Sequence, residues 1–312
     1  MKSQIRIAAA ALAAILLGAP RAGADPVAYV SEYNGGQVDR IDAAGAKTVF
    51  ASGIDHPKGL AVDATGDVYV ASGNNTILKF APSGASLGSL TTTGLANPFG
   101  IAFGPDGAIW AANSNDNTIH RFSTTGKDLG VFASANLSGP EALSFDSAGN
   151  AYVSNNYGPF GDTIRKFSST GTDLGVFVTT PPNGPNGSAF DAAGHFFVSI
   201  EGGAQIHEYS STGGDMGTFA NLGTDHPIGL AFAPGGDLFV TEFLSGQIHR
   251  FSPSGADLGT FASGLNQPVY IAFATSAAVP EPSIIALMAV GLAVTGLARL
   301  VTRARKWVSR AS

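Results

Sequence analysis

The chain has 312 residues, of which 44% are hydrophobic and 41 are glycine, whereas only 13% are charged. This composition excludes a disordered chain and a charge-rich helical protein, and it is typical of a turn-rich all-β protein. The absence of cysteine excludes disulfides, thiolate metal sites and cysteine nucleophiles. Between Asp25 and Ala278, nine Lys and Arg stand against 22 Asp and Glu, and this net charge of −13 excludes nucleic acid as an expected partner.

The first 24 residues have the features of an export signal. Lys2 and Arg6 precede an apolar run from Ile7 to Leu17, and the small residues AGA follow at positions 22–24. The run is too short to span a bilayer comfortably. We therefore predict a cleaved signal peptide over residues 1–24, with a helical core, and export of the remaining chain.

Residues 25–274 contain a sequence repeat with a period of about 40 to 45 residues. The pattern Pro-x-Gly-apolar-Ala-Phe, or a close variant, occurs six times, beginning at Pro57, Pro98, Pro140, Pro185, Pro227 and Pro268. Each of the first five copies is followed by a second apolar run, a third centred on Ile or Leu, and a fourth after a glycine turn. Four short strands per unit are typical of a β-propeller blade, so six units predict an all-β, six-bladed propeller.

The two ends of the repeat region predict how the ring closes. The beginning supplies only the second, third and fourth strands of a blade (VAYVSE, QVDRI and KTVF), whereas the last copy supplies only a first strand, Tyr270–Phe273. We expect these pieces to form one shared blade, which covers the edges that an open ring would expose. Along the first strands, large apolar residues alternate with alanine, so that a large face of one blade can pack on a small face of the next.

The repeat resembles a known group of propellers. The segment PFGIAFGPDGAIWAANSNDNTIHRF, Pro98 to Phe122, is similar to the NHL repeat and to the propellers of the SMP-30/gluconolactonase and streptogramin-lyase groups. The resemblance extends over about Val27 to Ala274. It implies the fold more strongly than an activity, because these groups include enzymes, binding modules and scaffolds.

The mouth of the central channel is where a propeller is expected to bind a ligand. The residue that follows each repeat proline is predicted to line this mouth, and among the six we select Lys58, Phe99, Glu141 and Asn186 as binding residues. Two Asp-His-Pro loops add His56 and His226. A streptogramin-lyase-like enzyme implies a histidine base at such a place, whereas the alternative is that both histidines cap their loops.

The resemblance to gluconolactonases also implies a divalent cation held by Glu, Asn and Asp from these loops. Glu141 and Asn186 match two of those places, but Ile228 stands where a third oxygen ligand is needed, and Ca²⁺ takes six to eight oxygens. The alternative is that Glu141 and Asn186 bond backbone amides or water. We therefore expect no cofactor, with Ca²⁺ or another divalent cation as the alternative.

Two further sets of polar residues recur at fixed places in the repeat. The ends of the second strands carry Glu32, Ser72, Asn113, Asn155, Ile200 and Glu242. We expect these side chains to bond turn amides, with a cation between Glu32 and Glu242 as the alternative. One position of the third strand carries His120, His207 and His249, and its recurrence indicates a role in the repeat itself.

The tail begins with a linker over residues 275–283 that contains the sequence VPEPS, with Pro280, Glu281 and Pro282 as its motif. Residues 284–312 then form an apolar run and a basic end, which predict a transmembrane helix with a cytoplasmic stop. This order resembles the PEP-CTERM sorting signal of Gram-negative bacteria. The resemblance implies an exosortase-type processing enzyme, a precursor tethered to the inner membrane, and delivery to the cell surface or extracellular matrix; a plain membrane anchor is the alternative.

Together these features predict an exported propeller that acts as a binding or scaffold module for a glycan, a peptide or a matrix component. The alternative is a metal-dependent lactonase or lyase that uses Glu141 and Asn186. No nucleophile elbow, phosphate loop or HExxH motif is present, so the sequence favours a protein that is not an enzyme.

Overall fold

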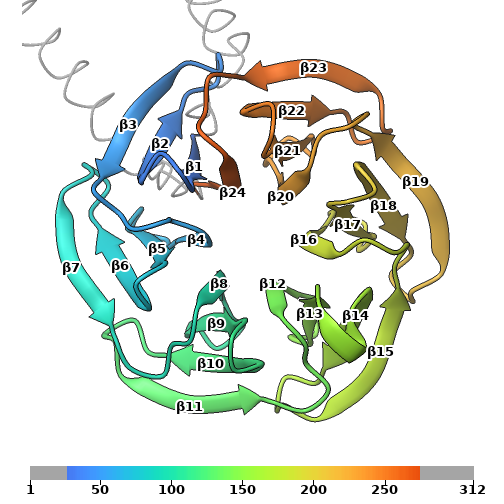
Figure 1. The fold of residues 1–312 in the computed structure, drawn as a ribbon, viewed down its shortest axis with the longest axis horizontal. Coiled ribbons are helices and arrows are strands. Elements are labelled where there is room, and N and C mark those ends of the chain that lie inside the picture. Colours follow the sequence, from blue (N-terminus) through green and yellow to red (C-terminus); the bar gives the residue numbers. More distant parts are fainter. Residues whose placement is uncertain (1–26, 275–312) are drawn as a thin grey trace, which may run out of the picture. The chain divides into compact units, whose positions relative to one another are not determined.

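The computed structural model describes residues 27–274, and these form a six-bladed β-propeller with four antiparallel strands in every blade (Figure 1). The predicted all-β class and the number of blades are therefore confirmed. The signal peptide, the linker with its Pro-Glu-Pro motif and the transmembrane helix lie outside the described residues. Within residues 27–274 no helix is long and apolar enough to cross a membrane.

The strands follow the predicted order, from the channel outwards, in every blade. Blade 1 contains β24 (Pro268–Phe273), β1 (Ala28–Glu32), β2 (Gln37–Ile41) and β3 (Lys47–Ser52). Blade 2 contains β4 (Leu60–Val62), β5 (Val68–Ser72), β6 (Thr76–Phe80) and β7 (Ser86–Thr91). Blade 3 contains β8 (Pro98–Phe103), β9 (Ile109–Asn113), β10 (Thr118–Phe122) and β11 (Asp128–Ala133).

The second half of the ring repeats this arrangement. Blade 4 contains β12 (Pro140–Phe145), β13 (Ala151–Asn155), β14 (Thr163–Phe167) and β15 (Asp173–Thr179), with a short 3₁₀ helix, η1 (Gly158–Phe160), after β13. Blade 5 contains β16 (Pro185–Phe190), β17 (Phe196–Ile200), β18 (Gln205–Tyr209) and β19 (Asp215–Asn221). Blade 6 contains β20 (Pro227–Phe232), β21 (Leu238–Glu242), β22 (Gln247–Phe251) and β23 (Asp257–Ala262).

Blade 1 closes the ring as the sequence predicts. Strand β24 pairs antiparallel with β1, so that Phe273 lies opposite Ala28 and Ile271 lies opposite Val30. In Figure 1 the first and last colours of the described chain meet in this one blade. Ser31 adds a second connection, because its hydroxyl accepts from the Tyr270 amide at 3.0 Å and donates to the Lys58 carbonyl of blade 2 at 2.6 Å.

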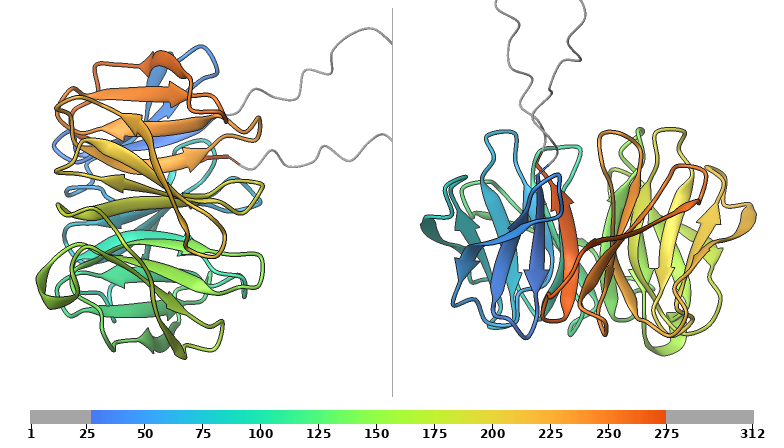
Figure 2. Two further views of the ribbon diagram at one scale, coloured as in Figure 1. Left: turned by 90° about the vertical axis from the view of Figure 1, so that its right-hand side faces the viewer. Right: turned by 90° about the horizontal axis from the view of Figure 1, so that it is seen from above.

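The core is divided into six apolar clusters, each of which lies between two neighbouring blades. Between blades 2 and 3, for example, Ala61 of one first strand and Ile101 of the next belong to the same cluster, as the alternation of first-strand residues predicts. The blades stand side by side around the channel, and their strands run between the two faces of the ring (Figure 2). Loops that lead into the inner strands therefore meet at one end of the channel.

Candidate functional site

The Pro-x-Gly motif places one side chain from every blade at the mouth of the channel. Its glycine lies where neighbouring inner strands touch: the Gly59 amide donates to the Phe99 carbonyl of the next blade at 2.8 Å, and a Cβ on Gly59 would meet that oxygen at 2.5 Å. Only glycine fits this approach without displacing the neighbour. The preceding side chain lines the mouth in all six blades, as Lys58, Phe99, Glu141, Asn186, Ile228 and Val269.

Below the mouth, Tyr270 crosses the channel. It stands where four other blades have the glycine of the motif, and its hydroxyl donates at 2.9 Å to the backbone carbonyl of Glu141 in blade 4, on the opposite side of the ring. Its ring lies edge-on to Phe99, with the centroids 6.1 Å apart. Burial raises the pKa of Tyr270 well above its ordinary value, and the Glu141 charge raises it further. Tyr270 therefore spans the channel, although it is not among the residues that line the pocket at the mouth, which we call the cup.

The cup has a volume of about 350 Å³, near the lower end for small-molecule sites. Loop residues complete its wall, and the sequence analysis did not select them: Tyr33, Asn97, Tyr157, Glu201 and Phe243. Three of these, Tyr33, Glu201 and Phe243, directly follow the last residue of a second strand. The residue after the second strand differs from blade to blade although the rest of the repeat is regular, and this difference can be seen in the sequence.

Glu141 is the most deeply buried ionisable group of the cup, with 1% of its surface exposed. Burial raises the pKa of its carboxyl to about 8, because ionisation in this setting loses hydration, and the charge of Glu201 raises it further. Nearby Asn156, Tyr157 and Lys58 act in the opposite direction. Glu141 Oε2 is buried without a hydrogen-bond partner. At neutral pH the group is mostly a neutral acid.

Lys58 lies two blades away from Glu141 and is also buried, with 5% of its surface exposed. Its Nζ donates to Asn97 Oδ1 and lies 5.4 Å from the centre of the Phe99 ring, a cation–π distance. Burial lowers the pKa of Lys58, while the charges of Glu141 and Asp55 raise it. Burial thus shifts the Lys58 amine and the Glu141 carboxyl of the cup in the same direction, towards their neutral forms.

Asn186 and Glu201, both from blade 5, connect the cup to its rim. Asn186 Nδ2 donates to Glu201 Oε2 at 3.2 Å, and Glu201 Oε1 lies 3.4 Å from His226 Nδ1. This bond fixes the orientation of the Asn186 amide, because the reverse orientation would place Asn186 Oδ1 against Glu201 Oε2. Asn186 Oδ1 is then buried without a partner, like Glu141 Oε2 in the adjacent blade.

The structure brings four of the six predicted binding residues into the cup, namely Lys58, Phe99, Glu141 and Asn186. His56 and His226 are not among the residues that line it. The His56 ring packs against Tyr33 with centroids 4.7 Å apart, and its Nδ1 lies 2.6 Å from Asp55 Oδ1. His226 accepts the Phe243 amide through its carbonyl at 3.0 Å, which gives it a loop-capping contact besides its contact with Glu201.

A divalent cation fits this cup only in part. Within residues 27–274 no three His, Asp or Glu side chains converge on one point. Glu141 Oε2 and Asn186 Oδ1 offer two oxygens, whereas Ca²⁺ takes six to eight, and Ile228 offers none. These residues do not form a metal centre by themselves, so a cation at Glu141 and Asn186 stays a prediction.

The recurrent third-strand histidines contact the outer strand of their own blade. His207 Nε2 lies 2.7 Å from Asp215 Oδ1, and His249 Nε2 lies 2.7 Å from Asp257 Oδ1, eight residues further on in both cases. In blade 4 the same two positions hold the ion pair of Arg165 and Asp173. These groups join neighbouring strands at the side of the ring, away from the cup.

The second-strand ends satisfy backbone groups in some blades and hold charges in others. Asn113 Nδ2 donates to the Gly94 carbonyl at 2.9 Å. Burial, together with Asp39, raises the pKa of Glu32 to about 7, and Lys47 bridges this pair at 3.4 and 3.5 Å. Glu242 Oε1 contacts His249 Nδ1 at 3.1 Å. Each of the two glutamates thus has its own partners within blade 1 or blade 6.

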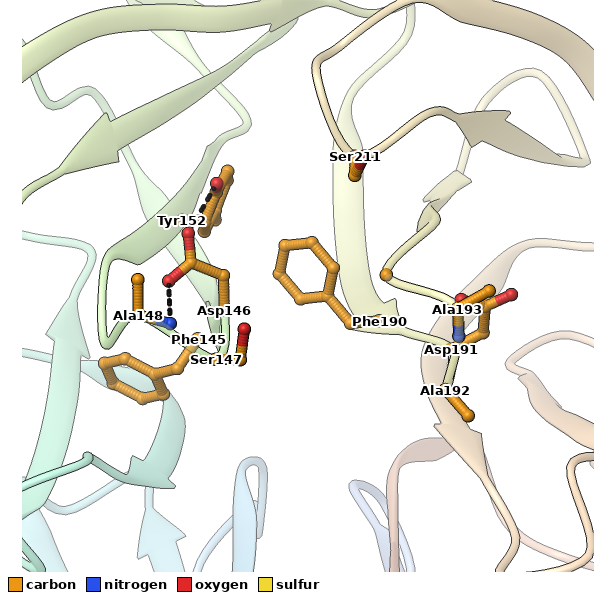
Figure 3. A pocket seen from close by; sticks show the side chains of 11 residues that line it. Phe145, Asp146, Ser147, Ala148, Tyr152, Phe190, Asp191, Ala192, Ala193 and Ser211 are labelled. Carbon is orange, nitrogen blue, oxygen red and sulfur yellow. Dashed lines mark hydrogen bonds between the residues drawn. The ribbon is translucent and has the colours of Figure 1, made fainter.

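A second pocket, of about 460 Å³, lies between blades 4 and 5 at the opposite ends of their inner strands (Figure 3). Phe145 and Phe190 form its apolar walls, and hairpin turns form its rim. The Asp146 carboxylate accepts from turn amides at 3.0 and 2.8 Å and from the Tyr152 hydroxyl at 3.0 Å. Because this carboxylate already has internal partners, the pocket is a poorer polar site than the cup.

The fold and the cup define a six-bladed propeller with an open pocket at its channel mouth. Among solved structures, the chain resembles a chain of the nidogen/laminin complex, with 18% identity, a TM-score of 0.72 and coverage of 80% of this chain and 99% of that one. It also resembles a gluconolactonase from Xanthomonas campestris, with 18% identity, a TM-score of 0.62 and coverage of 79% of this chain and 87% of that one. A third resemblance is to virginiamycin B lyase from Staphylococcus aureus, with 18% identity, a TM-score of 0.60 and coverage of 82% of this chain and 94% of that one.

These likenesses are all below 25% identity, so they show the fold alone. The expectation of a propeller with gluconolactonase-like and streptogramin-lyase-like neighbours is thereby confirmed at the level of structure. No family model and no curated protein matches the chain. Evidence for an activity of this protein must therefore come from the residues of the cup.

Proposed function

We propose that the channel-mouth cup binds a small saccharide or a closely related polyhydroxylated molecule. The observation that supports this most directly is the pair of buried, unpartnered oxygens, Glu141 Oε2 and Asn186 Oδ1. A buried polar atom without a partner costs about 1 to 3 kcal/mol. Sugar hydroxyls both donate and accept, so one ligand can satisfy both oxygens at once.

The remaining wall of the cup fits the same class of ligand. Its volume of about 350 Å³ accommodates one sugar ring with a substituent. Phe99 and Tyr157 offer aromatic surface to the C–H face of a sugar, while Lys58 favours a ligand with a carboxylate or several acceptors. A glycan end, which is one of the three ligand types predicted from the sequence, matches this wall better than a peptide or a large matrix surface.

The test is a binding screen on the purified full chain. A panel of methyl hexosides and the corresponding uronic acids is measured by calorimetry and ligand-observed NMR, with and without Ca²⁺. We expect at least one member to bind, and Asn186→Ala to weaken its affinity at least about tenfold, as expected for a lost polar partner in a buried site. Asn34→Ala, at an exposed position outside the cup, is the control and should bind as before. Absence of binding across the panel contradicts the proposal.

A second candidate function is a lactonase or lyase, which the fold supports as well as it supports a binding role. The observation that favours it is Glu141, whose pKa of about 8 makes it a proton donor near neutral pH, within one cup with Glu201. In this scheme water attacks the carbonyl carbon of a lactone and passes its proton to Glu201, the ring C–O bond breaks, and Glu141 donates a proton to the leaving oxygen.

The enzymatic candidate has its own measurement. Opening of sugar lactones is followed by proton release, and linearisation of quinupristin by mass spectrometry, with and without Ca²⁺. Turnover that Glu141→Gln abolishes while saccharide binding persists supports catalysis. Binding without turnover of any of these compounds removes this candidate and leaves the binding role.

We also propose that the propeller is exported and sorted through its C-terminal signal. The support is the sequence alone: an export signal over residues 1–24 and the order of Pro280–Pro282, apolar run and basic end. An exosortase-type enzyme then cleaves near the motif, and the propeller reaches the cell surface or matrix. Mass spectrometry of the mature protein tests this, because a C-terminus still at Ser312 contradicts processing.

A further inference from the structure

The wall of the cup is divided into a polar part and an apolar part. Blades 2 to 5 supply six residues with polar side chains and the Phe99 ring, namely Lys58, Asn97, Phe99, Glu141, Tyr157, Asn186 and Glu201, whereas blades 6 and 1 supply Ile228, Phe243, Val269 and Tyr33, none of which is charged. Blades 6 and 1 are neighbours, so their four residues form one continuous wall, which we call the apolar arc. Ile228 and Val269 are buried at its base, and Phe243 and Tyr33 are partly exposed above them.

The upper half of the apolar arc occupies a position that is polar or small in the other blades. The residue that follows the second strand is Tyr33 in blade 1 and Phe243 in blade 6, but it is Gly73, Ser114, Asn156 and Glu201 in blades 2 to 5. The repeat therefore does not require an aromatic ring here. Tyr33 and Phe243 lie with their ring centroids 6.5 Å apart, and the next residue, Leu244, has 59% of its surface exposed.

Exposed apolar side chains that continue the wall of a polar pocket indicate a ligand with an apolar part. From this division of the wall we infer that the ligand of the cup is amphipathic: a saccharide head that carries an alkyl, acyl or aryl substituent. The head lies against Glu141 and Asn186, and the substituent lies along the apolar arc and leaves the cup between Tyr33 and Phe243. This inference rests on the proposed function, because it assigns the head to the polar part of the same cup.

The inference is tested with butyl and hexyl versions of every methyl hexoside in the panel. Burying one methylene raises an affinity about three- to fourfold, so burial of only two of the five methylenes that separate hexyl from methyl raises it about tenfold. Phe243→Ser and Tyr33→Ser should each remove most of this gain while leaving the affinity for the methyl hexoside within about twofold. Leu258→Ser is the matched control, because Leu258 is a 51% exposed leucine in β23, at the outer side of blade 6.

The outcomes separate this inference from the proposed function. If a methyl hexoside binds and a hexyl group adds nothing, the apolar arc does not contact the ligand, and the inference is wrong while the saccharide site stands. If only hexyl compounds bind, and Phe243→Ser or Tyr33→Ser abolishes their binding, the arc is supported and the saccharide specificity is wrong. If the gain survives in both serine variants, the alkyl group binds elsewhere and the inference is wrong. If no compound binds, both are wrong.

Discussion

Glu141→Gln is expected to make the protein more stable. Glutamine has nearly the same shape as the neutral acid that the folded protein holds at position 141, but it does not have to take up a proton on folding. The pKa of Glu141 is raised from 4.5 to about 8 by burial. The unfolded chain ionises this group at neutral pH, whereas the folded protein keeps it protonated.

The magnitude follows from linkage. One unit of pKa shift corresponds to about 1.36 kcal/mol, so at pH 7 the raised pKa costs the wild-type protein about 3 kcal/mol. Between pH 4.5 and 8 the folded state binds more protons at this site than the unfolded state, so its contribution to stability falls as pH rises. The advantage of Glu141→Gln should thus be near zero at pH 4.5, grow with pH, and level off above pH 8.

The assay is urea unfolding of both proteins between pH 4.5 and 9, with the difference in unfolding free energy plotted against pH. All other titrating groups are common to the two proteins and largely cancel. Asp257→Asn is a control, because the Gly259 amide and His249 lower the pKa of Asp257 from 3.8, so the part of its contribution to stability that depends on its own protonation is lost only in acid below this pH range. A difference for Glu141→Gln that stays flat over this range would refute the reasoning.

Two further predictions concern the ring itself. Ser31→Ala should lower the free energy of unfolding by about 1 to 3 kcal/mol, because it leaves the Tyr270 amide and the Lys58 carbonyl without their partner. Ser154→Ala is the control, because it removes a buried hydroxyl that has no partner, and it should cost less than half as much. Equal losses in the two variants would contradict the role assigned to Ser31. Gly100→Ala should cost about 1 to 3 kcal/mol or more, because the new Cβ would overlap the Glu141 carbonyl and lie 2.9 Å from the Tyr270 hydroxyl. Gly235→Ala, which meets nothing within 4 Å and has no positive φ, is its control, and equal melting temperatures for the two variants would contradict the close approach of the inner strands.

The sequence identified the half of the cup that belongs to the repeat. Lys58, Phe99, Glu141 and Asn186 stand at one repeat position, so their common place at the mouth follows from the blade pattern. His56 and His226 share another repeat position, but their side chains lie outside the cup. The reason is that a repeat fixes where a backbone position lies, whereas the direction of a loop side chain depends on what surrounds it.

The sequence by itself determined the propeller. Each unit has an apolar pattern that is buried only when another unit packs on it, and the incomplete units at the two ends can bury theirs only by sharing a blade. The tertiary structure alone decided what the channel mouth is. Tyr270 closes the channel by reaching the Glu141 carbonyl across the ring, and Glu201, Phe243 and Tyr33 come together from blades far apart in sequence. The raised pKa of Glu141 likewise depends on burial, which arises only when six blades surround the site.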